Sequence, residues 1–160
     1  MDNSVRIMLM NENETRKVAA KIAENCRIGD ILILDGDLGA GKTHFTKWFV
    51  ESLQSGDDVV SPTFSIANFY RTQACGLLHI DLYRIETFRE FEDLGLDDYF
   101  YQSITLIEWG KKFISYFDAY ILISLHINDE NSRLMTVSYK GEQHKPLIDI
   151  LNYEMKGSIC

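Results

Sequence analysis

The chain has 160 residues, of which 46% are apolar and 12% aromatic, as is ordinary for a globular protein. A chain of this length can bury enough apolar surface to fold without disulfides or metals, so we expect a single domain over residues 1–160. Its 16 Lys and Arg residues stand against 24 Asp and Glu, which gives a formal net charge of −8. This acidity argues against direct binding of nucleic acid, because that binding needs clustered basic side chains.

The spacing of the cysteines and the length of the apolar stretches indicate where in the cell the protein is found. Cys26, Cys75 and Cys160 lie far apart and form no C-x-x-C pair, which favours a reducing environment. The longest apolar stretches, such as 119–125, are much shorter than the roughly 18 residues that would suggest a membrane span. We therefore expect a cytoplasmic protein without a membrane segment.

The first half of the chain alternates predicted helices and strands. Asn11 with Glu14 predicts the start of a helix with an acidic first turn. The short apolar run 31–34 predicts a buried strand, and a second helix follows it immediately. Two further strands are expected over 66–71 and 77–82, joined by a turn.

The second half continues the alternation. Thr87 and Glu90 match the capping box T-x-x-E of a third helix, and 104–107 reads as another buried strand. A half-exposed strand pair is expected over 120–125 and 135–139. Interleaved strands and helices argue for an α/β fold with three layers, αβα, around a mixed central sheet.

The loop between the first predicted strand and the second helix carries the strongest chemical motif. It satisfies the phosphate-binding pattern G-x-x-x-x-G-K-[ST], with Gly36, Asp37, Leu38, Gly39, Ala40, Gly41, Lys42 and Thr43. Glycine lets the backbone wrap closely around phosphates, so several N–H groups converge on them. We expect Lys42 to reach the β- and γ-phosphates of a nucleoside triphosphate, Thr43 to bind Mg²⁺, and the helix N-terminus to face the anion.

Two acidic residues stand at the ends of predicted buried strands. Asp81 ends the run 77–80 and Glu108 ends the run 104–107, so each would deliver a carboxylate to the sheet edge where ligands bind. Both are candidates for holding Mg²⁺ or orienting water. His79 lies two residues before Asp81, and strand alternation puts the two side chains on one face. No third ligand is spaced nearby, so a structural or switch role suits His79 better than a metal pair.

The nucleotide and the reaction class follow from what the sequence contains and lacks. The guanine-specific patterns N-K-x-D and D-x-x-G are absent from the 160 residues, which favours ATP over GTP. The arginines are scattered and no lid-like segment stands out, which argues against a small-molecule kinase without excluding one.

Several motifs in order make a more specific pattern. After Gly39-Ala40-Gly41-Lys42-Thr43 come Ser61-Pro62-Thr63-Phe64, His79-Ile80-Asp81-Leu82-Tyr83-Arg84, Gly95 and Glu108-Trp109. This arrangement resembles the signature of the TsaE (YjeE) family, the bacterial ATPases required for making threonylcarbamoyladenosine in tRNA. The resemblance implies a P-loop NTPase fold, Mg²⁺ and ATP as cofactors, and slow hydrolysis that supports the enzyme complex of TsaB and TsaD.

The resemblance also implies roles for individual residues. Lys42, Asp81 and Glu108 would be catalytic, with Thr43, Asp81 and Glu108 on the metal side. Thr63 would sit in a switch-like loop near the γ-phosphate, and Trp109 would lie near the nucleotide or the partner, although a core position suits it equally. His44 departs from the family pattern, which has a small hydroxyl residue there. The expected nucleotide-binding set is Gly36, Leu38, Gly39, Ala40, Gly41, Lys42, Thr43, His44, Thr63 and Trp109.

The leading hypothesis is a Mg²⁺-dependent ATPase that acts on the TsaB–TsaD complex, reaches tRNA only indirectly and does not itself form the threonylcarbamoyl bond. A small-molecule kinase, with Asp81 as the base toward a substrate hydroxyl, is the first alternative. A nucleotide-gated adaptor is the second, in which ATP binding orders the segment 61–70 and hydrolysis is incidental. Residues 128–160 match no diagnostic pattern.

Overall fold

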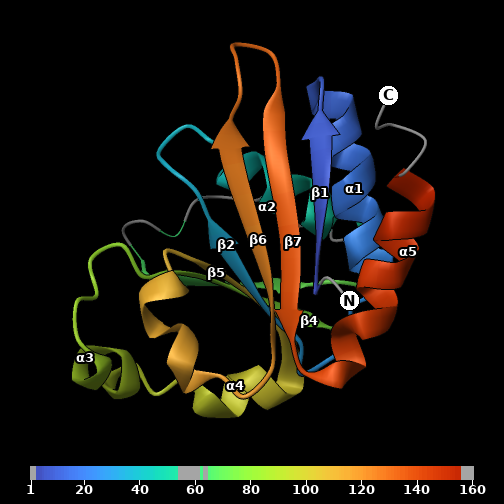
Figure 1. Ribbon diagram of the computed structural model, residues 1–160. Helices are drawn as coiled ribbons and strands as arrows, with labels where there is room; N and C mark the ends of the chain where they lie inside the picture. The colour runs from blue at the N-terminus through green and yellow to red at the C-terminus, as the bar shows by residue number, and fades with distance from the viewer. Residues whose placement is uncertain (1–2, 54–61, 63–64, 156–160) are drawn as a thin grey trace.

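The computed structural model describes residues 3–53, 62 and 65–155 (Figure 1). In chain order the elements are β1 (Ser4–Leu9), α1 (Glu12–Glu24), β2 (Ile31–Asp35), α2 (Lys42–Ser52), β3 (Ala67–Arg71), β4 (Gly76–Asp81), α3 (Phe88–Asp93), α4 (Asp97–Gln102), β5 (Ser103–Glu108), the 3₁₀ helix η1 (Lys111–Tyr116), β6 (Tyr120–Ile127), β7 (Arg133–Lys140), the 3₁₀ turn η2 (Glu142–His144) and α5 (Lys145–Met155).

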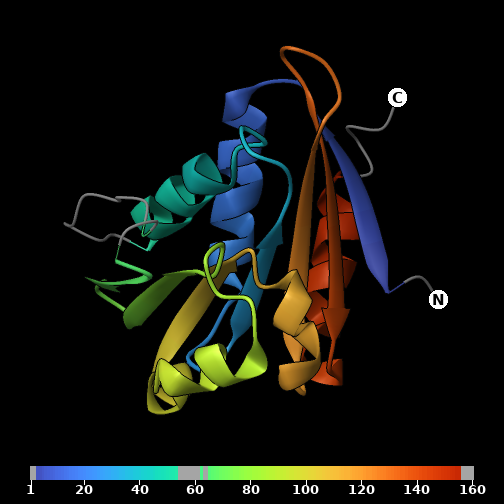
Figure 2. The same cartoon turned by 90° about the vertical axis from the view of Figure 1, so that its left-hand side faces the viewer.

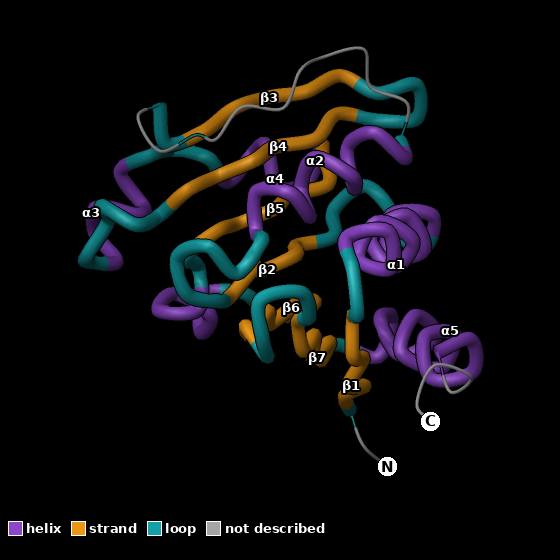
Figure 3. The backbone as a smooth tube through the Cα atoms, turned by 90° about the horizontal axis from the view of Figure 1, so that it is seen from above, coloured by secondary structure: helices purple, strands orange, loops and turns teal. Residues whose placement is uncertain are grey.

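The strands form one seven-stranded sheet in the order β1-β7-β6-β2-β5-β4-β3, which Figure 3 shows from above. The four central strands β6, β2, β5 and β4 run parallel to one another, whereas β3 pairs antiparallel with β4, β7 with β6, and β1 with β7. The sheet is therefore mixed. The carboxyl ends of β2, β4 and β5 meet at one edge, where open α/β sheets bind ligands.

Helices cover both faces of the sheet, so the fold has three layers. The alternating residues of β2 show the division: Leu32 and Leu34 join the core beneath α1, α2 and α5, while Ile31 and Ile33 join the core beneath α3, α4 and η1. Figure 2 shows α2 lying beside α1, with which it packs. The expected αβα architecture with a mixed central sheet is confirmed, and the first four residues of β2 are apolar and buried, as a strand covered on both faces requires.

Local signals placed several helices correctly. Asn11 caps α1, its side chain accepting a hydrogen bond from the Glu14 amide at 3.0 Å. Thr87 and Glu90 form the expected reciprocal capping box of α3. The strand expected from residue 66 begins one residue later, because Ile66 has a left-handed backbone, with φ of 67°. The end of α2 expected at residues 55–56 lies outside the described residues.

Other elements gave no distinct sequence signal. The residues before Asn11 form strand β1, which pairs with β7 from the other end of the chain. Helix α4 is only six residues long, and α5 arises within the stretch 128–160 that matched no pattern. Three apolar side chains of α5, Leu147, Ile148 and Leu151, are buried against the sheet. Within the described part of the chain, every helix is too short or too polar to cross a membrane.

Candidate functional site

The loop between β2 and α2 adopts a conformation that needs its glycines. Gly39 and Gly41 have φ of 79° and 105°, in the left-handed region. At Gly36, a Cβ atom would lie 2.5 Å from the carbonyl oxygen of Leu125, so only glycine fits. Gly41 is the N-cap of α2, and no described side chain caps this helix. Its first amides are thus available to an anion at the positive end of the helix.

Lys42 folds back over the loop that precedes it. Its ammonium group donates hydrogen bonds to the carbonyl oxygens of Gly36 and Asp37, the latter at 3.2 Å. The same Nζ lies 4.3 Å from the ring centroid of Trp109, a cation–π distance. The side chain is 7% exposed. Lys42 therefore places a buried positive charge beside the phosphate-binding loop.

Asp81 and Glu108 come together at the carboxyl edge of the sheet. They are directly opposite each other in the parallel pairing of β4 with β5. Both are buried, with 7% and 3% exposure. Asp81 Oδ1 accepts a hydrogen bond from the Tyr83 amide at 2.9 Å, which fixes the start of the following turn. Two buried carboxylates side by side repel each other, and a cation between them relieves that repulsion.

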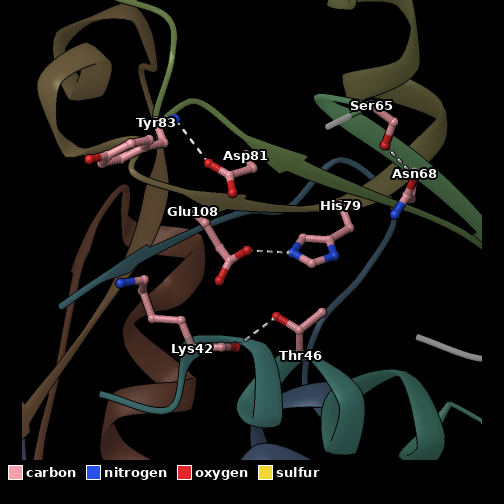
Figure 4. Close-up of polar contacts among 8 residues, drawn as sticks. All are labelled: Lys42, Thr46, Ser65, Asn68, His79, Asp81, Tyr83 and Glu108. Carbon is pink, nitrogen blue, oxygen red and sulfur yellow. Dashed lines mark hydrogen bonds and ion pairs between the residues drawn. The ribbon is translucent and has the colours of Figure 1, made fainter. Parts of the chain in front are cut away.

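His79 lies on the same face as these carboxylates, as strand alternation predicts. Figure 4 shows its ring above Thr46 of α2, with Nε2 toward Glu108. The distance between Nε2 and Glu108 Oε2 is 3.1 Å, and both side chains are buried. The sequence favoured a structural or switch role for His79 over a metal pair with Asp81, and the described residues contain no group of three His, Cys, Asp or Glu side chains that could hold a metal.

Trp109 is partly buried: it packs against the core beneath α3, α4 and η1 and also lies at the site. Its backbone φ is 59°, a left-handed value that is rare for an aromatic residue and turns the chain sharply after β5. The indole packs edge-on against Tyr83, with ring centroids 5.0 Å apart, and lies under the Lys42 ammonium. Trp109 therefore contacts both the core and the residues of the site.

A cavity of about 290 Å³ joins these elements. Its lining includes six predicted site residues from the loop and helix α2 together with the two carboxylates and the indole: Leu38, Gly39, Gly41, Lys42, Thr43, His44, Asp81, Glu108 and Trp109, with Asp37 beside them. Gly36 lies behind this cavity against Leu125, and Ala40 faces a second cavity. Thr63, the remaining predicted residue, lies outside the described residues.

The second cavity, of about 490 Å³, lies on the other side of the start of α2. Gly41 and His44 line both cavities, so the two adjoin at the end of the glycine-rich loop. The wall of the larger one comes from the start of α1, from α2 and from the β6–β7 connection, with Asn11, Trp48, Glu130, Asn131 and Arg133. Sequence reasoning missed this cavity, since Asn11 was recognised only as a helix cap and 128–160 carried no motif.

His44 takes part in both cavities despite its departure from the family pattern. Its imidazole packs against the indole of Trp48, with ring centroids 5.7 Å apart. The ring therefore continues the aromatic wall of the larger cavity up to the loop.

The donor set of the smaller cavity fits Mg²⁺. This ion prefers oxygen ligands and is usually held by one or two carboxylates together with phosphate oxygens and water. The cavity offers the carboxylates of Asp81 and Glu108 and the hydroxyl of Thr43. Among the described residues, no thiol lines this cavity. The one imidazole in its lining belongs to His44, which packs against Trp48. These oxygens suit a hard cation that arrives with a triphosphate.

Comparison with known proteins identifies the family. Residues 9–135 match the family model described as "Threonylcarbamoyl adenosine biosynthesis protein TsaE". The chain belongs to the TsaE family. The matched region contains the phosphate-binding loop, both carboxylates and Arg133, so the residues of both cavities lie within the family's shared region.

Individual TsaE proteins extend the match. The chain is 48% identical over 102 residues to tRNA threonylcarbamoyladenosine biosynthesis protein TsaE of Bacillus subtilis, which is 63% of each protein. It is 33% identical over 147 residues to the TsaE of Rickettsia felis, covering 91% of this chain and 85% of the relative. The crystal structure of Bacillus subtilis YdiB superposes with a TM-score of 0.78 at 31% identity, covering 94% and 95% of the two chains.

Proposed function

We propose that this TsaE-family chain is a Mg²⁺-dependent ATPase that supports threonylcarbamoyladenosine modification of tRNA by acting on the TsaB–TsaD complex. The observation that carries the proposal is the single cavity in which the glycine-rich loop, Lys42 and two strand-end carboxylates meet. The relatives' names contribute the pathway. A cytoplasmic location, expected from the sequence, belongs to the same proposal.

Each side chain has a task in this scheme. The loop amides and the start of α2 bind the β- and γ-phosphates, and Lys42 exchanges its carbonyl partners for phosphate oxygens. Thr43, Asp81 and Glu108 would hold Mg²⁺, which neutralises the charge that develops on the transferred phosphoryl group. The buried Glu108 carboxylate also orients the attacking water, since it is 3% exposed and lines the cavity.

The larger cavity suits the base and ribose of the nucleotide. It adjoins the phosphate-binding loop through Gly41 and His44, and it combines the Trp48 indole with polar groups from Asn11 and Arg133. Ligand pockets typically have this composition, an apolar wall with a few polar groups. A triphosphate in the smaller cavity and a base in the larger one would place a nucleotide across the start of α2.

The experiment that tests the function is ATP hydrolysis by the purified chain at fixed Mg²⁺, alone and with TsaB and TsaD from the same source. A low basal rate that rises with these partners supports the proposal. A rate indifferent to both proteins contradicts a partner-directed ATPase. The kinase alternative predicts labelled phosphate on a metabolite instead of free phosphate, and the adaptor alternative predicts that a non-hydrolysable analogue sustains repeated rounds of modification.

A further inference from the structure

The side chain of His79 is completely buried, and the structure gives it a polar contact with Glu108. Its Nε2 lies 3.1 Å from Oε2 of Glu108, 29 residues further along the chain. Carboxylate oxygens accept hydrogen bonds, so an N–H at Nε2 of His79 would donate to Oε2 of Glu108. The imidazole therefore delivers one hydrogen bond into the candidate site from behind.

The other ring nitrogen explains why this hydrogen bond has a fixed direction. Nδ1 of His79 is buried and has no hydrogen-bond partner among the described residues. A proton on Nδ1 would leave a buried N–H donor unsatisfied, which is costlier than leaving a lone pair there. The surroundings of the ring thus select the tautomer whose only N–H faces Glu108.

Glu108 depends on this contact. Within the described part of the chain, the structure gives its carboxylate no other hydrogen bond or ion pair. A glutamate side chain has three rotatable bonds, so an unrestrained carboxylate would occupy several positions. Figure 4 shows Oε2 held by His79 and the second oxygen turned away from the ring. One oxygen is anchored, and the other remains for the cavity that Glu108 lines.

We propose that His79 is a positioning residue that holds the Glu108 carboxylate in its working orientation through the Nε2–Oε2 hydrogen bond. The proposal rests on the role given to Glu108 under the proposed function. Groups that orient metal-site or catalytic carboxylates in this way typically affect metal affinity or activity by about 10- to 100-fold.

Two substitutions separate positioning from mere filling of the core. His79→Leu keeps an apolar group of moderate size and removes the donor, whereas His79→Gln keeps an N–H donor on a side chain of similar reach. We expect His79→Leu to lower kcat for ATP by about 10- to 100-fold with little change in KM, and His79→Gln to recover most of the loss. Equal losses in both variants would overturn the proposal.

A matched control removes a different buried polar group. Thr105 is also fully buried, its hydroxyl also has no partner among the described residues, and it lies on the opposite face of β5 from Glu108. Thr105→Val should leave hydrolysis unchanged. A loss of activity in Thr105→Val as large as that in His79→Leu would mean that core perturbation explains both effects.

A second readout does not need turnover. In ¹⁵N-labelled protein without nucleotide, His79 should show a protonated Nε2 and an unprotonated Nδ1. Glu108→Gln should shift the Nε2 resonance of His79 and leave that of the exposed His126 in place. A protonated Nδ1, or a His79 resonance that ignores Glu108→Gln, would overturn the proposal even if His79→Leu does not fold.

A double variant distinguishes this inference from the function beneath it. If His79 acts through Glu108, His79→Leu should cost nothing further in the Glu108→Gln background, whereas additive losses contradict positioning. Failure of the wild-type chain to bind or hydrolyse ATP would sink the proposed function, yet the His79 nitrogen spectrum would still report whether the contact exists. Wild-type hydrolysis that His79→Leu leaves intact would sink the positioning role alone.

Discussion

Asp81 and Glu108 stand directly opposite each other at the carboxyl ends of neighbouring parallel strands, β4 and β5. The pairing brings together two buried acids that are separated by 26 intervening residues in the sequence. It also places both on the face that carries the start of α2 and its lysine, as Figure 4 shows. The register of β4 with β5 thus brings the two acidic residues of the site together, and the lysine at the start of α2 supplies the basic one.

Removal of the Lys42 ammonium should abolish tight ATP binding. Charged hydrogen bonds contribute about 1.5–3 kcal/mol each, so Lys42→Ala is expected to lower the affinity for ATP at least about tenfold. Lys47→Ala is the matched control, because Lys47 lies on the same helix and is exposed. Isothermal titration with ATP and Mg²⁺ measures both. Equal affinities for the two variants would remove Lys42 from the phosphate site.

Neutralisation of Asp81 should raise the Mg²⁺ concentration that ATP hydrolysis requires. Asp81→Asn keeps an oxygen to accept the Tyr83 amide hydrogen bond and loses the charge that a cation needs. We expect the Mg²⁺ concentration for half-maximal hydrolysis to rise about tenfold or more. Asp93→Asn, on the exposed surface of α3, serves as control. A Mg²⁺ titration that matches wild type would exclude Asp81 from the metal side.

Substitution of Gly36 should destabilise the fold and distort the loop. Gly36→Ala brings a methyl group to 2.5 Å from the Leu125 carbonyl oxygen, whereas Gly29→Ala, also at positive φ, meets nothing within 4 Å. Left-handed strain alone costs about 1–2 kcal/mol, and the clash should add about 1–3 kcal/mol for Gly36→Ala. Urea unfolding of both variants gives the difference. Similar losses at the two positions would mean that the loop shifts to absorb the clash.

The stability of the protein should fall in mildly acidic solution because of His144. Burial lowers the pKa of its imidazole below the usual 6.5, and nearby Asp30 opposes this only in part. The unfolded chain therefore binds the proton more readily, and stability decreases as pH falls from about 6.5 to the lower folded pKa. Below that value the loss is complete, and above 6.5 it is absent.

The measurement for His144 is the free energy of unfolding between pH 8 and pH 5. His144→Gln should flatten the part of the profile that begins near pH 6.5, whereas the exposed His126→Gln should leave it as in wild type. A profile that keeps its full slope in His144→Gln would assign the acid sensitivity to other groups.

Local sequence was sufficient to predict the glycine-rich loop between β2 and α2 and the starts of α1 and α3. Gly36, Gly41 and Lys42 act within a few residues of one another, so the pattern itself contains the geometry. The caps Asn11 and Thr87 likewise bond to amides three residues away, at Glu14 and Glu90. In each case the interaction closes over a short segment, where the order of residues fixes which groups can meet.

Only the tertiary structure decided which distant groups join that loop. Strand-end position made Asp81 and Glu108 candidates, but their register, the His79 contact and the approach of Arg133 to the larger cavity depend on strand order across the sheet. Apolar residues on both faces specify that a strand is buried, but they do not specify which strands are its neighbours. The sequence determined which reactive side chains this TsaE protein has, and the strand order of the sheet determined which of them lie together at the site.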